Sequence, residues 1–291
     1  MSDDHVYPTL DDGSSSDAQW AFGTGFEDPL HGVDTTLPAG VDGAELAAYC
    51  LALGDDALVL AQRLAQWCTL APELEEELAL ANIGLDLLGQ ARLLYTRAGQ
   101  ADGTGRTEDD FAYWREAHEF SCVQLAELPG GDFAFSMARL TAFATWRLAL
   151  FERLTGAVDP LLAAVAAKGV KELAYHRQYA ARWVVRLGDG TDVSREKMQR
   201  ALDEVWPHLG ELFASHPTER RAVAGGFGVD PGELRREVEA TLREVVDAAG
   251  LTVPPIGEAE ALGRDGGHTE ALGVLLDELQ SVARAHPGAS W

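Results

Sequence analysis

The sequence has few of the residues that several common classes of protein require. It holds only three cysteines, and these have no C-x-x-C spacing. Neither a disulfide framework nor a zinc knuckle is indicated, and a reducing compartment fits. No run of about 18 apolar residues occurs, and the N-terminus lacks the basic and apolar regions of a signal peptide. We therefore expect a soluble, cytoplasmic protein with no membrane partner.

Positive charge is also scarce. The chain has 23 Lys and Arg against 47 Asp and Glu, which gives a formal net charge of -24 at pH 7. Such a chain repels phosphate backbones and anionic membranes at long range. We expect no nucleic-acid partner.

The first 40 residues differ from the rest of the chain. They contain no Lys or Arg and include the polar stretch Gly13-Ser-Ser-Ser16. Such a segment cannot bury enough apolar surface to offset the entropy lost on ordering. We predict a mostly disordered acidic arm over residues 1–40 and one helical domain over residues 41–291, with a cap at its C-terminal end.

Helical periodicity begins near residue 43, where apolar residues start to recur at spacings of three and four. A first helix is predicted from Ala44 to about Trp67, with an interruption at Gly54-Asp-Asp56, where an aspartate can cap a new start. Later helices are predicted to follow the N-caps Thr107, Asp159 and Asp230. The predicted fold is all-α, an antiparallel helical bundle with additional C-terminal helices.

The second predicted helix, from Pro72 to Gly99, has an apolar stripe of the kind that an amphipathic helix turns toward a core. The stripe consists of Leu74, Leu78, Ala81, Leu85 and Leu88. A neighbouring polar line consists of Glu75, Asn82, Asp86 and Gln90.

Two helices carry halves of a dinuclear iron signature. Four-helix carboxylate proteins that bind two metal ions offer Glu-x-x-His from each of two helices. The corresponding pairs here are Asp86-x-x-Gly89 and Glu172-x-x-Tyr175, in which glycine and tyrosine replace the histidines. His176 lies about 100° further round its helix. The scaffold of an oxygenase is thus predicted without metal ligands.

Two other interpretations of these residues stay open. Glu172 and His176 can form an i, i+4 pair, and Asp86 can pair across the bundle with a lysine such as Lys168 or Lys171. Alternatively, Asp86, Glu172 and His176 can belong to an independent metalloenzyme. A free-standing helical adaptor is a further hypothesis.

The tail contains a glycine-rich segment, Gly263-Arg-Asp-Gly-Gly-His-Thr-Glu270. Exposed amides and a guanidinium suit an anion, but the spacing matches neither a P-loop nor a dinucleotide fingerprint. The favoured interpretation is a docking cap, with Arg264, His268 and Glu270 holding the C-terminus on the bundle or on another chain. No G-x-S-x-G elbow of a serine hydrolase occurs.

Several of these segments, in this order, resemble the C subunits of ring 1,2-phenylacetyl-CoA epoxidases. They are Leu53-Gly-Asp-Asp-Ala-Leu58, Ala71-Pro-Glu-Leu-Glu-Glu76, Asp86-Leu-Leu-Gly-Gln-Ala-Arg92, Gly131-Asp-Phe133, Lys171-Glu-Leu-Ala-Tyr-His176, Trp183-Val-Val-Arg-Leu-Gly-Asp-Gly190, Gly266-Gly-His-Thr-Glu270 and His286-Pro-Gly-Ala-Ser-Trp291. The resemblance spans about residues 45–291.

The resemblance implies a ferritin-like structural subunit of a multicomponent monooxygenase that acts in phenylacetate catabolism. A homologous catalytic subunit would hold the diiron centre and bind the CoA thioester. A reductase that draws on NADPH would supply electrons, and a small bridging subunit would complete the hetero-oligomer, with self-association also allowed. This chain would have no catalytic residue and would bind no metal or cofactor.

Overall fold

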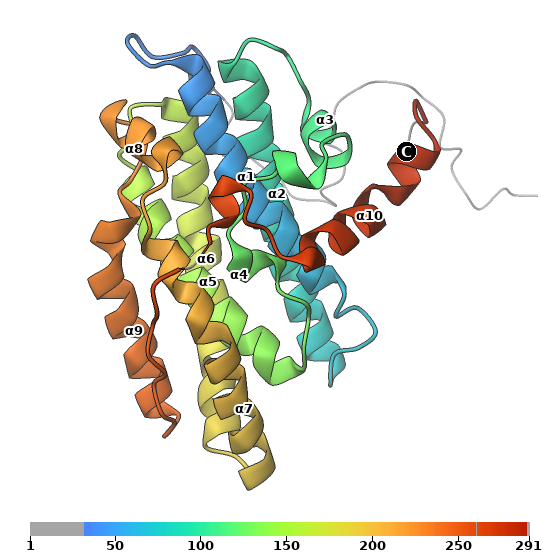
Figure 1. The fold of residues 1–291 in the computed structure, drawn as a ribbon, viewed down its shortest axis with the longest axis vertical. Helices are drawn as coiled ribbons and strands as arrows, with labels where there is room; N and C mark the ends of the chain where they lie inside the picture. Colours follow the sequence, from blue (N-terminus) through green and yellow to red (C-terminus); the bar gives the residue numbers. More distant parts are fainter. Residues whose placement is uncertain (1–31, 260, 290–291) are drawn as a thin grey trace, which may run out of the picture.

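A computed structural model describes residues 32–259 and 261–289 of the chain, and all regular structure in these ranges is helical (Figure 1). The α-helices are α1 (Gly43–Ala65), α2 (Leu74–Ala101), α3 (Glu108–Tyr113), α4 (Gln124–Glu127), α5 (Phe133–Leu154), α6 (Pro160–Gly188), α7 (Asp192–Val205), α8 (Pro217–Ala224), α9 (Arg235–Ala248) and α10 (Glu270–Ala285). The 3-10 helices are η1 (Ala117–Glu119), η2 (Trp206–Phe213), η3 (Pro231–Leu234) and η4 (Gly263–Asp265).

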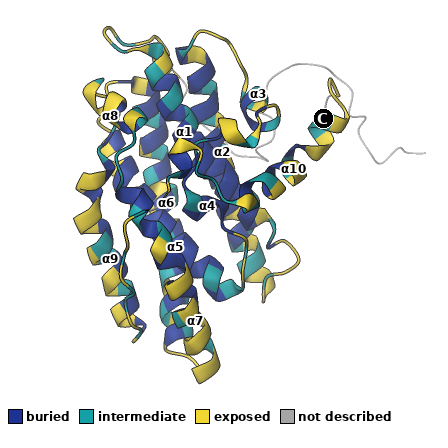
Figure 2. Cartoon of the chain, in the orientation of Figure 1, coloured by how far each residue is buried: buried dark blue, intermediate teal, exposed yellow. Residues whose placement is uncertain are grey.

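Four long helices form the centre of the molecule. α1 packs along α2, and α5 packs along α6. Contacts between α2 and α6 join these two pairs. α7 and α9 cover the outside of α5, while α8, α10 and η4 lie over α1 (Figure 1). As a result, α5 is buried along nearly its whole length (Figure 2). The predicted all-α bundle with additional C-terminal helices is confirmed.

The three predicted N-caps are confirmed. The Thr107 side chain accepts from the Asp110 amide in a reciprocal capping box that opens α3. Asp159 accepts from the Leu162 amide at the start of α6. Asp230 caps η3, which leads directly into α9. These signals are local, since the side chain and the amides that it caps lie within three residues.

The predicted break in the first helix is wrong, because α1 continues through Gly54, Asp55 and Asp56. Both aspartates are fully buried and face partners from distant segments rather than capping a new helix. Asp55 accepts from the Tyr95 hydroxyl across 2.6 Å, and the Tyr95 ring lies where a side chain at Gly54 would be. The glycine therefore allows α1 and α2 to approach closely.

The predicted apolar stripe of α2 does not face the core. Leu74, Leu78 and Leu85 are 65%, 56% and 62% exposed. The buried face of the helix consists instead of Leu80, Ile83, Leu87, Ala91 and Leu94. α2 thus has two apolar faces, and only one of them is covered within the described part of this chain.

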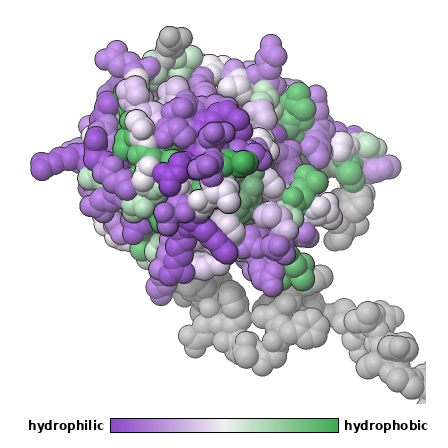
Figure 3. Space-filling view, turned by 90° about the horizontal axis from the view of Figure 1, so that it is seen from below, coloured by the Kyte–Doolittle hydropathy of each residue, from purple (hydrophilic) through white to green (hydrophobic). Residues whose placement is uncertain are grey.

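Most of the predicted acidic arm, residues 1–31, lies outside the described residues. Residues 32–40 form a loop whose Thr35 carbonyl accepts a hydrogen bond from Arg97 across 2.7 Å. Seen from below, the surface is mostly hydrophilic with separate apolar patches (Figure 3). None of the described helices combines the length and the hydropathy that a membrane span needs.

Candidate functional site

An arginine occupies the middle of the four-helix bundle. Arg147 of α5 is fully buried, and its Nε donates to Oε1 of Gln90 on α2 across 3.0 Å. One terminal nitrogen donates to the Leu53 carbonyl of α1 across 3.1 Å, and the other lies 3.9 Å from Oδ2 of Asp56. The Phe151 ring lies under the guanidinium, 4.4 Å from its carbon. Burial lowers the pKa of Arg147 to about 10, so the side chain is cationic at pH 7.

The network continues from Gln90 into α6. The Gln90 amide nitrogen donates to Oε2 of Glu172 across 2.9 Å, and the other oxygen of Glu172 pairs with Lys168 one turn earlier. Each of the four bundle helices therefore contributes one polar member, namely Asp56, Gln90, Arg147 and Glu172. Sequence reasoning missed Arg147, although a charged residue inside the apolar run Phe143–Phe151 could have indicated a buried cation.

These interior residues do not fit a dinuclear iron centre. Such a centre takes about four carboxylates and two histidines that project inward from the four helices. Within the described residues, the interior carboxylates of these helices already pair with basic side chains: Asp55 with Arg115, Asp56 with Arg264 and Glu172 with Lys168. A guanidinium has no free electron pair for a metal ion, so Arg147 repels a cation rather than binding it.

The two sequence-predicted ligand pairs do not come together as a site. Tyr175 is half-exposed on the outer face of α6, and the space around Gly89 is open. Nε2 of the buried His176 lies 2.9 Å from Oδ2 of Asp86 and joins α6 to α2. The two expected pairings are therefore corrected: Glu172 pairs with Lys168 rather than His176, and Asp86 pairs with His176 rather than with a lysine.

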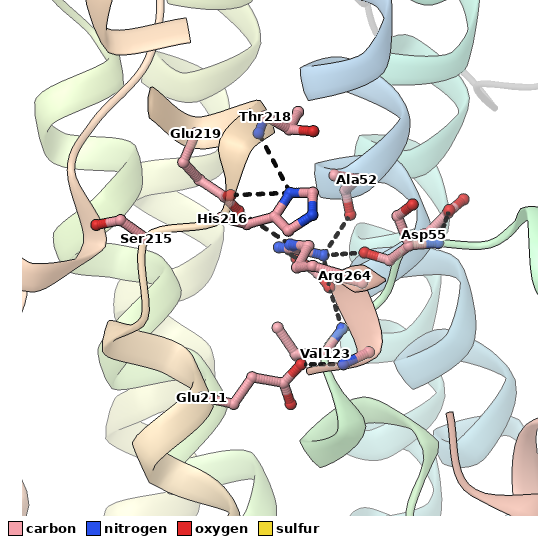
Figure 4. Close-up of polar contacts among 12 residues, drawn as sticks. Ala52, Asp55, Val123, Glu211, Ser215, His216, Thr218, Glu219 and Arg264 are labelled. Carbon is pink, nitrogen blue, oxygen red and sulfur yellow. Dashed lines mark hydrogen bonds and ion pairs between the residues drawn. The ribbon is translucent and has the colours of Figure 1, made fainter. Parts of the chain in front are cut away.

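Arg264 fastens the C-terminal segment to the bundle (Figure 4). Its guanidinium donates to both carboxylate oxygens of Asp56 across 2.8 and 2.7 Å and to Glu219 of α8 across 3.0 Å. It also donates to the carbonyl of Ala52. Burial acts to lower the pKa of Arg264, but the two carboxylates outweigh it and hold that pKa well above its usual value.

The other two predicted docking residues differ in their surroundings. The His268 side chain is mostly buried, and Nδ1 lies 2.5 Å from Oε1 of Glu127 on α4. Glu270 is exposed at the start of α10. The structure thus places Arg264 and His268 against the bundle and Glu270 at the surface.

The uncovered face of α2 has the spacing of a helix-packing seam. Leu74, Leu78, Ala81, Leu85 and Leu88 follow one another at alternate steps of four and three residues. This is the repeat of the a and d positions that pack against a second helix in a coiled coil. Soluble proteins rarely expose such a continuous apolar row unless it contacts a partner. We call these five residues the leucine seam.

Charge is unevenly distributed between α2 and α6. α6, which packs against α2, contains five Lys or Arg residues and a single acid, Glu172, in a chain whose net charge is -24. The first turn of α2 contains Glu75, Glu76 and Glu77. α2 and α6 thus differ in charge, with acids in the first turn of α2 and mostly basic residues among the charged positions of α6.

The long helices packed in a bundle, with polar side chains of all four helices joined in its interior, define a ferritin-like helical protein. The sequence profile of the family described as phenylacetic acid catabolic protein matches residues 34–291. The chain is also 45% identical over 247 residues to the C subunit of 1,2-phenylacetyl-CoA epoxidase from Escherichia coli (strain K12), and the match covers 85% of this chain and 99% of that protein. The chain therefore belongs to the phenylacetic acid catabolic protein family, which confirms the resemblance seen in its motifs.

Proposed function

We propose that the chain is a non-catalytic structural subunit of a multicomponent diiron oxygenase that epoxidises phenylacetyl-CoA in aerobic phenylacetate breakdown. The main support is the position of Arg147, whose cationic side chain lies in the bundle interior that would otherwise have to hold two metal ions. The substrate class follows from the similarity to the C subunit of the epoxidase.

In this proposal the redox chemistry belongs to other subunits. A homologous catalytic subunit, here called the sister subunit, holds the diiron centre, and a reductase that oxidises NADPH delivers electrons to it. A small bridging subunit is the remaining partner. The donor set inside this bundle supports such a division, because its carboxylates form ion pairs with Arg264 and Lys168.

The leucine seam is the surface that we assign to the sister subunit. Its heptad spacing suits a long helix of another chain, and a ferritin-like partner is built from long helices. The basic residues of α6 and the acids at the start of α2 favour a partner helix pair with acids opposite α6 and basic residues opposite the start of α2. Such charge complementarity would select one orientation of the partner and speed its association.

The role of the subunit is then mechanical. Arg147 and its hydrogen bonds hold four helices in a fixed register without a metal, so the outer faces of α2 and α6 form a preorganised surface. When the leucine seam is buried against the sister subunit, the binding free energy also stabilises the folded state of the catalytic chain.

Co-expression with the gene of the sister subunit tests the proposal. A tag on this chain should retain the sister subunit in equimolar amount, and the complex should unfold at a higher temperature than either chain alone. Ring epoxidation should need both chains, because the purified chain alone should have no activity with phenylacetyl-CoA and reductase. Activity of the chain alone would favour an independent metalloenzyme, and failure to bind the sister subunit would favour a free-standing adaptor.

A further inference from the structure

A second group of ligand-type side chains lies apart from the bundle interior. Cys122 precedes α4, Glu127 ends α4, and His268 comes just before α10. One sulfur, one carboxylate oxygen and one imidazole nitrogen from these residues all lie within 4.8 Å of one another. Cys122 and Glu127 are fully buried, and the His268 side chain is 9% exposed.

The three donor atoms lie close to one another. Sγ of Cys122 lies 3.5 Å from Oε1 of Glu127, and Nδ1 of His268 lies 2.5 Å from the same oxygen. The residues come from two segments more than 130 positions apart in the sequence, so the cluster joins the C-terminal segment to α4.

The second carboxylate oxygen of Glu127 and the second ring nitrogen of His268 already have partners. Oε2 of Glu127 accepts hydrogen bonds from the amide and hydroxyl of Thr269 across 2.7 and 2.9 Å. Nε2 of His268 lies 2.8 Å from the Phe120 carbonyl. A carbonyl can only accept a hydrogen, so Nε2 carries a proton and Nδ1 is the nitrogen able to offer an electron pair. Metal-binding histidines are commonly oriented by such a bond from their second nitrogen.

We propose that Cys122, Glu127 and His268 bind one zinc ion. Thiolate sulfur, carboxylate oxygen and imidazole nitrogen are all ligands that zinc takes, and its preference for four tetrahedral ligands leaves one position for water. The thiolate and the carboxylate together neutralise the charge of the ion. Zinc bonds of about 2.0–2.3 Å place neighbouring ligands about 3.3–3.7 Å apart, so His268 has to move from Glu127 by about 1 Å.

Bound zinc would fasten the segment before α10 to α4. Without zinc, the same three side chains form a hydrogen-bonded group in which Glu127 accepts from the Cys122 thiol and from Nδ1 of the His268 ring. Binding of zinc would displace both of these protons to solvent. A zinc site and a purely hydrogen-bonded group differ in the metal content of the chain. Metal content can be measured whether or not the chain is a subunit of an oxygenase.

The test is the zinc content of the full-length chain, produced in zinc-supplemented medium and desalted without chelator. We expect about one zinc per chain in the parent and less than about a tenth in Cys122→Ser and His268→Gln. Cys68→Ser is the matched control, because Cys68 is exposed and lies outside the cluster, and it should retain the metal. Circular dichroism of each variant establishes that the helical fold is present.

Cobalt substitution gives a second, direct measurement. Co²⁺ bound in place of zinc should show a thiolate-to-cobalt charge-transfer band in the parent and in Cys68→Ser, and no such band in Cys122→Ser. A parent chain with less than about a tenth of a zinc, or a Cys122→Ser variant with undiminished zinc, would overturn the proposal.

Discussion

Arg147 and Gln90 join α5 to α2 through the middle of the bundle, with Nε of the arginine donating to Oε1 of the amide across 3.0 Å. Gln90 also links α2 to α6, since its amide nitrogen donates to Glu172 of α6. An amide is suited to this place because it accepts from a cation on one side and donates to an anion on the other. The bundle interior is thereby held by one continuous chain of hydrogen bonds.

Replacing Arg147 should therefore destabilise the fold strongly. In Arg147→Ala, Gln90 and the Leu53 carbonyl lose a buried donor and a cavity remains, so we expect a loss of at least about 2 kcal/mol in the free energy of unfolding by urea. Arg92→Ala is the control, because Arg92 forms an exposed pair with Glu108 that should contribute less than about 1 kcal/mol. Equal urea midpoints for the two variants would contradict the account.

The ion pair of Arg264 and Asp56 should be strongly coupled. Arg264→Met leaves Asp56 and Glu219 buried beside an uncharged side chain, and we expect a loss of about 3–5 kcal/mol. Adding Asp56→Asn should recover more than about 1 kcal/mol of it, because the uncompensated charge is then removed. The measurement is a double-mutant cycle of urea unfolding, and strictly additive losses would show that the two side chains act independently.

Glu211 should give the stability a specific dependence on pH. Burial raises the pKa of its carboxyl to about 7, above the ordinary value of 4.5, even though it accepts from the amides of Gln124 and Gly263. The folded chain then binds more protons than the unfolded chain between these two values, so this group lowers stability as pH rises from about 4.5 to 7.

Comparison with Glu211→Gln isolates this effect, because glutamine does not titrate. The stability of the variant relative to the parent should increase by up to about 3 kcal/mol from pH 4.5 to pH 7.5. The control is Glu237→Gln on α9, which removes the carboxyl of an exposed ion pair with Arg153. A constant difference for Glu211→Gln across this range would mean that the carboxyl is not perturbed.

The leucine seam should matter for assembly rather than for folding. Leu78→Gln with Leu85→Gln should leave the urea midpoint of the isolated chain nearly unchanged, because both side chains are mostly exposed. The affinity for the sister subunit should fall by about ten- to a hundredfold, as expected for two central interface residues. The control, Val193→Gln with Val274→Gln, alters equally exposed aliphatic side chains on α7 and α10. Equal binding by both double variants would place the interface elsewhere.

Local sequence signals predicted the helix starts well. Thr107, Asp159 and Asp230 cap helices as expected because a cap needs only the next few amides. The break expected in the first helix was wrong for the opposite reason. Asp56 is an acceptable helix residue here because Arg264, 208 positions away, neutralises it, and no local pattern reveals such a partner.

The periodicity of apolar residues also failed to predict which face of α2 is buried. A repeat of apolar residues shows which side chains share a face, but it does not say whether the chain itself covers that face. The apolar row through Leu78 and Leu85 was thus predicted correctly as one face of the helix, but it was expected to face the core and it is exposed. The candidate site was only half predictable, since Gln90 and Glu172 stood out as polar positions while Arg147 lay hidden in an apolar helix.

The measurement that tests the central claim most directly is the iron content of this chain, produced alone in iron-replete medium and desalted without chelator. We predict less than about a tenth of an iron per chain, because a guanidinium and paired carboxylates fill the bundle interior. Close to two iron per chain, lost on substitution of Glu172 and Asp56, would contradict the account and make this chain a catalyst in its own right.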